Sequence, residues 1–122
     1  MFAMNLILFL LLIKHAIADL GLQGYIQGPS KQYYLSRKLV IHSLHHGIGT
    51  FLVLLYFINF ELAVVLGILD MMLHWQIDFF KTRFVIAHNL NNTQRKFWWV
   101  QAVDQMLHYS CYVLIIAIIS LA

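Results

Sequence analysis

The chain has 122 residues, of which 61% are hydrophobic and only 11% are charged, and its formal net charge is +3. An ordinary soluble domain has about 25% charged residues, so this composition excludes that class and indicates a single integral membrane domain. The one cysteine, Cys111, excludes an internal disulfide and a cysteine-rich zinc motif.

Four apolar segments are long enough for membrane-spanning helices, at about residues 2–20, 39–58, 62–80 and 97–122. They predict an all-α fold, an integral membrane four-helix bundle that forms one transmembrane domain over residues 1–122. The alternative for the first segment is a secretory signal peptide, because Ala-Ile-Ala at its end resembles a cleavage site. Lys14 interrupts the apolar run and no basic residue precedes it, which favours a retained span.

The connections between these segments differ in charge. Residues 21–38 and 81–96 hold seven of the eight Lys and Arg residues, whereas the turn around Asn59 and Glu61 holds none. Pro29 is expected to break the first connection. By the positive-inside rule, the two basic connections face the cytoplasm and both termini lie on the outer side. The expected location is the bacterial cytoplasmic membrane, with several passes.

Histidine and aspartate residues recur one helical turn apart. Residues four positions apart share one face of a helix, and each aspartate has a histidine at that spacing. The residues concerned are His15, Asp19, His42, His45, His46, Asp70, His74, Asp78, Asp104 and His108. In the predicted topology all lie within roughly 17 Å of the cytoplasmic boundary. Hydrocarbon disfavours such groups, so we expect them to face the bundle interior or an aqueous cavity.

These ten side chains form a candidate metal site. Imidazole and carboxylate groups without thiolates suit zinc, manganese or iron. Helical bundles build dinuclear centres from facing helices, and ten candidate ligands exceed the need of one ion, so we expect two divalent metal ions. His74, Asp78 and Asp104 are the candidate catalytic residues. Alternatively, some aspartates could orient a ligating histidine, or the whole set could form interhelical hydrogen bonds.

The basic residues beside this site have two interpretations. They could bind anionic lipid head groups, or they could attract an anionic substrate. Lys81, one turn beyond Asp78, is the candidate for contact with substrate. Membrane lipids and an anionic amphiphile are the expected partners, and a homo-oligomer stays open. Nucleic acid is not expected, because no basic surface is interleaved with exposed aromatic residues.

Four motifs in this order resemble those of a family of small bacterial and phage membrane proteins of unknown function. The motifs are His15-x3-Asp19 followed by Gln23, His42-x3-His46, His74-x3-Asp78 followed by Lys81, and Asp104-Gln105-x2-His108. The resemblance covers nearly the whole chain and implies that Gln23, Lys81 and Gln105 belong to the site. It implies no reaction. A looser likeness is to bacterial membrane-bound metal-dependent hydrolases. The segment His42-x2-His45-His46 also resembles one histidine box of membrane fatty-acid desaturases, whose other boxes are absent.

The function that we favour from the sequence is metal-dependent hydrolysis of an anionic, phosphorylated lipid or amphiphile. In this hypothesis Asp78 and His74 bind metal and Lys81 binds the charge of the substrate. One alternative is a di-iron oxidase or hydroxylase that acts on an acyl chain. Another is a non-enzymatic metal-binding membrane protein, including a phage-encoded one that acts on host defence or lysis.

Overall fold

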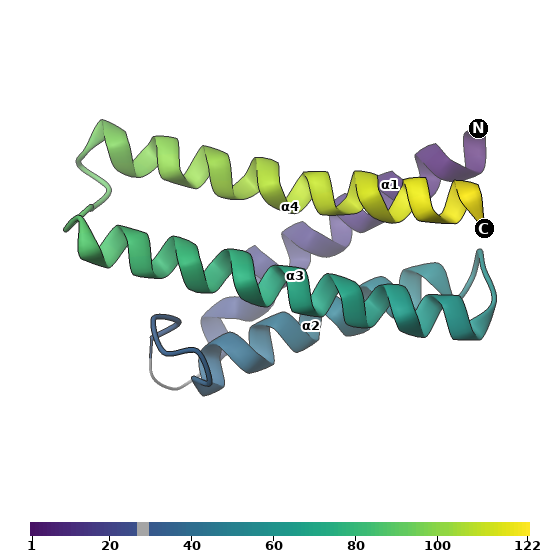
Figure 1. Cartoon of the computed structure of the whole chain (residues 1–122), viewed down its shortest axis with the longest axis horizontal. Helices are drawn as coiled ribbons and strands as arrows, with labels where there is room; N and C mark the ends of the chain where they lie inside the picture. The colour runs from purple at the N-terminus through teal and green to yellow at the C-terminus, as the bar shows by residue number, and fades with distance from the viewer. Residues whose placement is uncertain (27–29) are drawn as a thin grey trace.

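The structure is a computed structural model that describes residues 1–26 and 30–122, so the expected break at Pro29 lies outside the described residues. The described chain is helical throughout, with connecting turns. Its elements are α1 (Phe2–Ala16), η1 (Ile17–Leu22), η2 (Gln23–Tyr25), α2 (Arg37–Leu54), α3 (Phe60–Ala87) and α4 (Arg95–Leu121). The four α-helices pack into one bundle, with both termini and the α2–α3 connection at the same end (Figure 1). The predicted all-α four-helix bundle is confirmed.

Side-chain caps fix the beginnings of the two central helices. The Oγ of Ser36 accepts a hydrogen bond from the amide of Leu39 at 3.2 Å, before α2. The Oδ1 of Asn59 accepts one from the amide of Leu62 at 2.9 Å, before α3. Such oxygens satisfy amides that have no partner within the helix. The structure therefore has a turn at Asn59, as the sequence predicted.

Helix α3 is longer than its apolar pattern predicted. It continues from Phe80 to Ala87, because the residues in between include no glycine or proline that would end it. The helix ends before Asn89, whose φ of 49° lies in the left-handed region. Lys81 and Arg83 therefore lie on a helix and not in a loop, which fixes the place of Lys81 relative to Asp78.

Three helical segments are long and apolar enough to cross a membrane: Phe2–Tyr25, Phe60–Ala87 and Arg95–Leu121. This finding indicates a membrane protein. Helix α2 is not among them. It has 18 residues, and its histidines and amino-terminal cations make it less apolar than the other three. The predicted second span is thus a helix of the bundle, and its crossing of the membrane stays a prediction.

Helices α2 and α3 cross with their backbones close together. A Cβ on Gly47 would lie 2.8 Å from the carbonyl oxygen of Gly67, and a Cβ on Gly67 would lie 2.9 Å from that of Gly47. Small residues allow such close approach between helices in membranes. The crossing places the histidine face of α2 directly opposite the polar face of α3.

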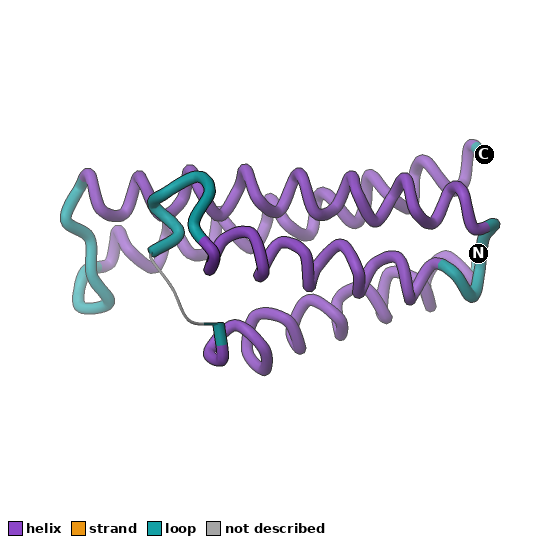
Figure 2. Tube along the Cα trace, turned by 90° about the horizontal axis from the view of Figure 1, so that it is seen from below, coloured by secondary structure: helices purple, strands orange, loops and turns teal. Residues whose placement is uncertain are grey.

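The interior of the bundle has an apolar part and a polar part. The apolar core consists of Ile7, Leu11, Leu54, Ala63, Leu66, Tyr112, Ile115 and Ile119. The polar part includes His42, His74 and His108, which are buried, and the last two lie near the middle of α3 and α4. The α3–α4 connection and residues 30–36 lie together at the end of the bundle opposite the termini (Figure 2).

Candidate metal centre

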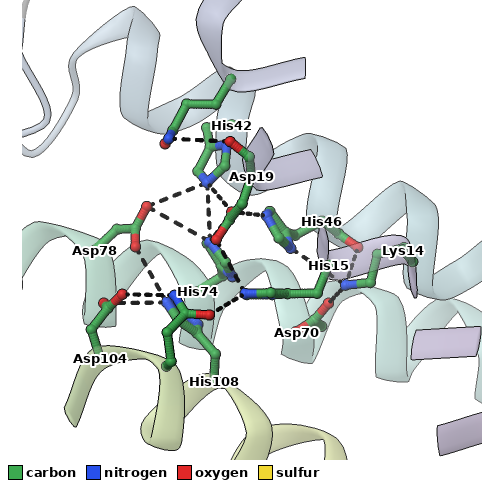
Figure 3. A network of polar contacts seen from close by, with 12 residues as sticks. Lys14, His15, Asp19, His42, His46, Asp70, His74, Asp78, Asp104 and His108 are labelled. Carbon is green, nitrogen blue, oxygen red and sulfur yellow. Dashed lines mark hydrogen bonds and ion pairs between the residues drawn. The ribbon is translucent and has the colours of Figure 1, made fainter. Parts of the chain in front are cut away.

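Side chains from η1, α2 and α3 converge on one carboxylate oxygen (Figure 3). The Oδ1 of Asp19 lies 3.1 Å from the Nε2 of His42, 3.0 Å from that of His46 and 4.0 Å from that of His74. One ligand atom from each of the four residues lies within 4.8 Å of every other. We call Asp19, His42, His46 and His74 the first ligand group.

The spacing of the first ligand group suits a metal ion. A tetrahedral zinc ion with bonds of 2.0–2.1 Å separates its ligand atoms by roughly 3.4 Å. The Nε2 atoms of His42 and His74 are 3.2 Å apart. Metal-bound histidines usually donate their other N–H group. Here the Nδ1 atoms of His42 and His74 are buried and have no hydrogen-bond partner in the described part of the chain, which departs from that usual arrangement.

A second ligand group consists of His74, Asp78 and His108. The Nε2 of His108 lies 3.3 Å from Asp78 Oδ1 and 3.4 Å from Asp104 Oδ1. The Asp104 oxygen is buried and accepts no hydrogen bond from the described residues, so it is available as a further ligand. All of these residues were predicted from their spacing.

Asp78 connects the two ligand groups. Its Oδ1 faces His108, whereas its Oδ2 lies 3.4 Å from the Nε2 of His42 and 3.7 Å from that of His74. A carboxylate with one oxygen toward each group has the arrangement of a bridging ligand. The Nε2 of His74 belongs to both groups, and a single nitrogen can bind only one ion.

Asp19 reaches the centre from a π-helical turn, η1, which directly follows α1. Such turns are rare and occur frequently at functional sites. The turn preserves the predicted contact with His15, whose Nε2 lies 3.1 Å from Asp19 Oδ2. Gly21 disfavours a regular α-helix in residues 17–22, but it does not specify a π-helical turn.

His15 lies beside the ligand groups and not within them. Its Nδ1 is 2.8 Å from the hydroxyl of Tyr112, and its Nε2 is 3.2 Å from Gln105 Oε1. Both ring nitrogens therefore have protein partners. The geometry makes His15 an orienting neighbour of Asp19, whereas its spacing alone had predicted a ligand.

The structure assigns Asp70 a different role from the predicted metal ligand. Its Oδ2 accepts hydrogen bonds from Lys14 Nζ at 2.8 Å and from Thr50 Oγ1 at 2.6 Å. Lys14 also donates to the hydroxyl of Tyr112 at 3.0 Å. Asp70 is thus the counter-ion of a buried lysine and lies outside both ligand groups. Sequence reasoning missed these partners, although a lysine inside an apolar segment signals the need for a buried counter-charge.

His45 also lies outside both ligand groups. His45 directly precedes His46 in the chain, so its side chain leaves α2 about 100° around the helix from that of His46. It is half-buried and lines a separate cavity with Arg37 and Ile41. Its position on the same part of the helix as His42 and His46 had made His45 a candidate, and His45 belongs to neither ligand group.

The three residues predicted to bind substrate lie at the edge of the centre. Lys81 Nζ and Gln105 Nε2 each donate to Asp104 Oδ2 at 3.2 Å. Gln23 accepts a hydrogen bond from Lys31, which also contacts Asp78. Burial lowers the pKa of the Lys31 ammonium below its ordinary value, and the Asp78 carboxylate opposes this shift. Two lysines thus contact carboxylates of the centre from its basic side.

The fold and the buried cluster together define a class of protein, a small helical bundle with three helices long and apolar enough to cross a membrane and with a histidine–aspartate interior. The chain belongs to the family described as "Protein of unknown function (DUF3307)", which matches residues 7–122. No curated protein and no solved structure matches the chain. The family resemblance predicted from the four motifs is confirmed. The likeness to membrane-bound metal-dependent hydrolases has no support in these comparisons.

Proposed function

We propose that this protein is a metal-dependent hydrolase of the bacterial cytoplasmic membrane whose substrate is an anionic, phosphorylated lipid or amphiphile. The observation that carries the proposal is Asp78, with one carboxylate oxygen beside each ligand group. Dinuclear hydrolytic centres place two ions about 3.5–4 Å apart, and a bridging carboxylate suits that spacing. The ligands include aspartates and no thiolates, which favours zinc, manganese or iron.

The residues of the two ligand groups, together with Asp104, would divide between two ions. Asp19, His42 and His46 would hold one, and Asp78, Asp104 and His108 the other, with His74 bound to either. When bound, such ions supply Lewis-acid chemistry, because they activate water and offset negative charge on a phosphoryl group.

Two side chains at the edge of the centre have separate roles: Lys81 acts on the substrate, and Gln105 acts on Asp104. Lys81 would offset the charge of the substrate, since its ammonium lies 3.2 Å from Asp104 at the rim of the centre. Gln105 holds Asp104 in place through the other hydrogen bond to Oδ2.

Metal analysis of the purified protein tests the first step. We expect about two zinc, manganese or iron ions per chain. His74→Ala should lower that number, whereas His88→Ala, at an exposed position outside both groups, should leave it unchanged. Chelation should lower the melting temperature, because a ligand at 100 times its Kd stabilises a fold by about 2.7 kcal/mol. A preparation that contains no metal and melts at the same temperature after metal is added would overturn the proposal.

Hydrolysis of an alkyl phosphoester by the metal-loaded protein tests the reaction. Asp78→Asn should abolish turnover. Lys81→Ala should raise KM several-fold while the metal content stays unchanged, because the lysine belongs to neither ligand group. Loss of metal from the Lys81 variant would contradict its role toward the substrate.

One observation favours a second candidate, a di-iron oxidase or hydroxylase that acts on an acyl chain. An apolar cavity of about 570 Å³ between α3 and α4 extends to Asp104, and an acyl-chain oxidase requires such a slot beside its metals. Assays with and without oxygen separate the two. Activity that demands oxygen, a reductant and iron would replace the hydrolase proposal with this one.

A further inference from the structure

Two cavities beside the metal centre share Lys81. The first, which we call the tail cavity, lies between α3 and α4 and is mostly apolar. Its lining includes Phe80, Phe84, Trp99, Val100, Val103 and Leu107. The second, which we call the head cavity, has about 580 Å³. Its lining includes Asp19, Gln23, Ser30, Lys31, Lys38 and Lys81. Each volume is in the range of a site for one small ligand.

The two cavities differ in the chemistry that they offer. The wall of the head cavity carries three lysines and one aspartate. Two of these lysines, Lys31 and Lys81, contact Asp78 and Asp104, which do not belong to that wall. Lys38 forms no ion pair with the described residues and is free to bind an anion. The tail cavity opens on the side of the bundle, where Phe80 and Trp99 are exposed. A molecule that enters from the membrane can reach it sideways.

Both cavities reach the metal centre. Asp104 lines the tail cavity, and its Oδ1 lies 3.4 Å from His108 Nε2 of the second ligand group. Asp19 of the first ligand group lines the head cavity. A ligand that occupied both cavities would therefore pass beside the ligand groups at the point where its polar and apolar parts join.

From this arrangement we infer that the protein binds a single-chain amphiphile. Its alkyl chain lies in the tail cavity and its phosphate-bearing head group in the head cavity, with Lys81 at the junction. The inference rests on the proposed function for the phosphate, and it adds the number of chains and the position of each part. Lys31 and Lys81 then exchange a carboxylate partner for the anionic head group.

Binding of a probe that cannot be hydrolysed tests this inference apart from catalysis. The probe is 12-bromododecylphosphonate, added to the full chain in phosphatidylcholine nanodiscs, because bromine quenches tryptophan fluorescence at short range. We expect saturable quenching that dodecylphosphonate reverses, and that inorganic phosphate or dodecanol at equal concentration does not. Trp99→Phe should remove the quenching. Trp98→Phe should keep it, because the Trp98 ring does not line the tail cavity.

Two substitutions test the two parts of the site. Val103→Phe should weaken binding about tenfold by filling the tail cavity, as overpacking does. Val113→Phe is its matched control, on an exposed position of the same helix outside the cavity, and should bind as the unchanged chain does. Lys38→Met should weaken binding of the phosphonate several-fold.

Several results would overturn the inference. Quenching that does not saturate, or that is equal for Trp98 and Trp99, would mean that the probe only dissolves in the bilayer. Equal affinity for a two-chain phosphatidic acid would refute the single chain. Hydrolysis of a short-chain phosphoester without binding of the probe would overturn this inference and leave the proposed function. Binding of the probe without hydrolysis of dodecyl phosphate by metal-loaded protein would support the inference and overturn the proposed function.

Discussion

The ammonium group of Lys14 lies inside the bundle and is surrounded by hydrogen-bond acceptors. Its side chain is 9% exposed, and it contacts Asp70, Tyr112 and the carbonyl oxygen of His46. An uncompensated charge at the centre of a membrane costs about 2.5–3.5 kcal/mol on insertion scales. Lys14 and Asp70 therefore depend on each other, and the loss of either leaves a buried charge.

Lys14→Met is expected to destabilise the protein by about 3–5 kcal/mol, because it leaves Asp70 buried and unpaired. The double variant Lys14→Met with Asp70→Leu should recover most of that loss, since both charges are then absent. Thermal melting in one detergent measures the effect, with Arg83→Met, at an exposed position, as the control. A single variant as stable as the unchanged chain would contradict the mutual dependence.

At this scale the sequence predicted which faces are polar and not which groups meet. The spacing of Asp70, His74 and Asp78 predicted one buried stripe, and all three are buried. The same spacing could not separate a ligand from a counter-ion, because the partner of Asp70 is Lys14, 56 residues away in the chain. Contacts between helices decide whether such a residue is a ligand or a counter-ion, and the periodicity of one helix carries no information about those contacts.

Among the elements, α2 and α3 cross with little room between their backbones. Gly47 lies against both the backbone of Gly67 and the side chain of Met71, at 2.8 and 2.7 Å from an added Cβ. The sequence predicted both helices and the turn at Asn59, but not this crossing. It also could not predict the π-helical turn that carries Asp19, because Gly21 signals a weak helix there and not the kind of turn.

Gly47→Ala is expected to lower the free energy of unfolding by about 1–3 kcal/mol, because the new methyl group overpacks the crossing. It should also lower metal content, since a wider crossing moves His46 away from His74. Gly24→Ala is the matched control, because a Cβ there meets nothing within 4 Å. Equal melting temperatures and equal metal content for the two variants would show that α2 has room to shift without affecting the centre.

For the whole molecule, the basic connections lie at one end and the termini at the other (Figure 1), whereas His74 and His108 of the ligand groups lie near the middle of α3 and α4. Seven of the eight Lys and Arg residues lie in residues 21–38 and 81–96, and the bundle places both segments at the same end (Figures 1 and 2). The sequence predicted that the two basic connections share one end, because neighbouring helices of such a bundle alternate in direction. The placement of the site near the cytoplasmic leaflet stays a prediction. The charge difference predicts that this end faces the cytoplasm.

Cysteine labelling of intact cells tests that orientation in a Cys111→Ala background. A membrane-impermeant reagent should label Tyr56→Cys, in the exposed α2–α3 connection, and should not label Arg83→Cys until the cells are opened. Labelling of position 83 from the outside would reverse the orientation and place the centre near the other leaflet.

The pairing of charges between distant helices also sets the order in which the buried contacts of Lys14 can form. Lys14 emerges from the ribosome long before Asp70, which lies 56 positions later, and before Tyr112, which lies 98 positions later. Until α3 has been synthesised, Lys14 lacks the Asp70 carboxylate to which it donates in the folded bundle. The buried contacts of Lys14 are therefore complete only after the third and fourth helices have packed against the first.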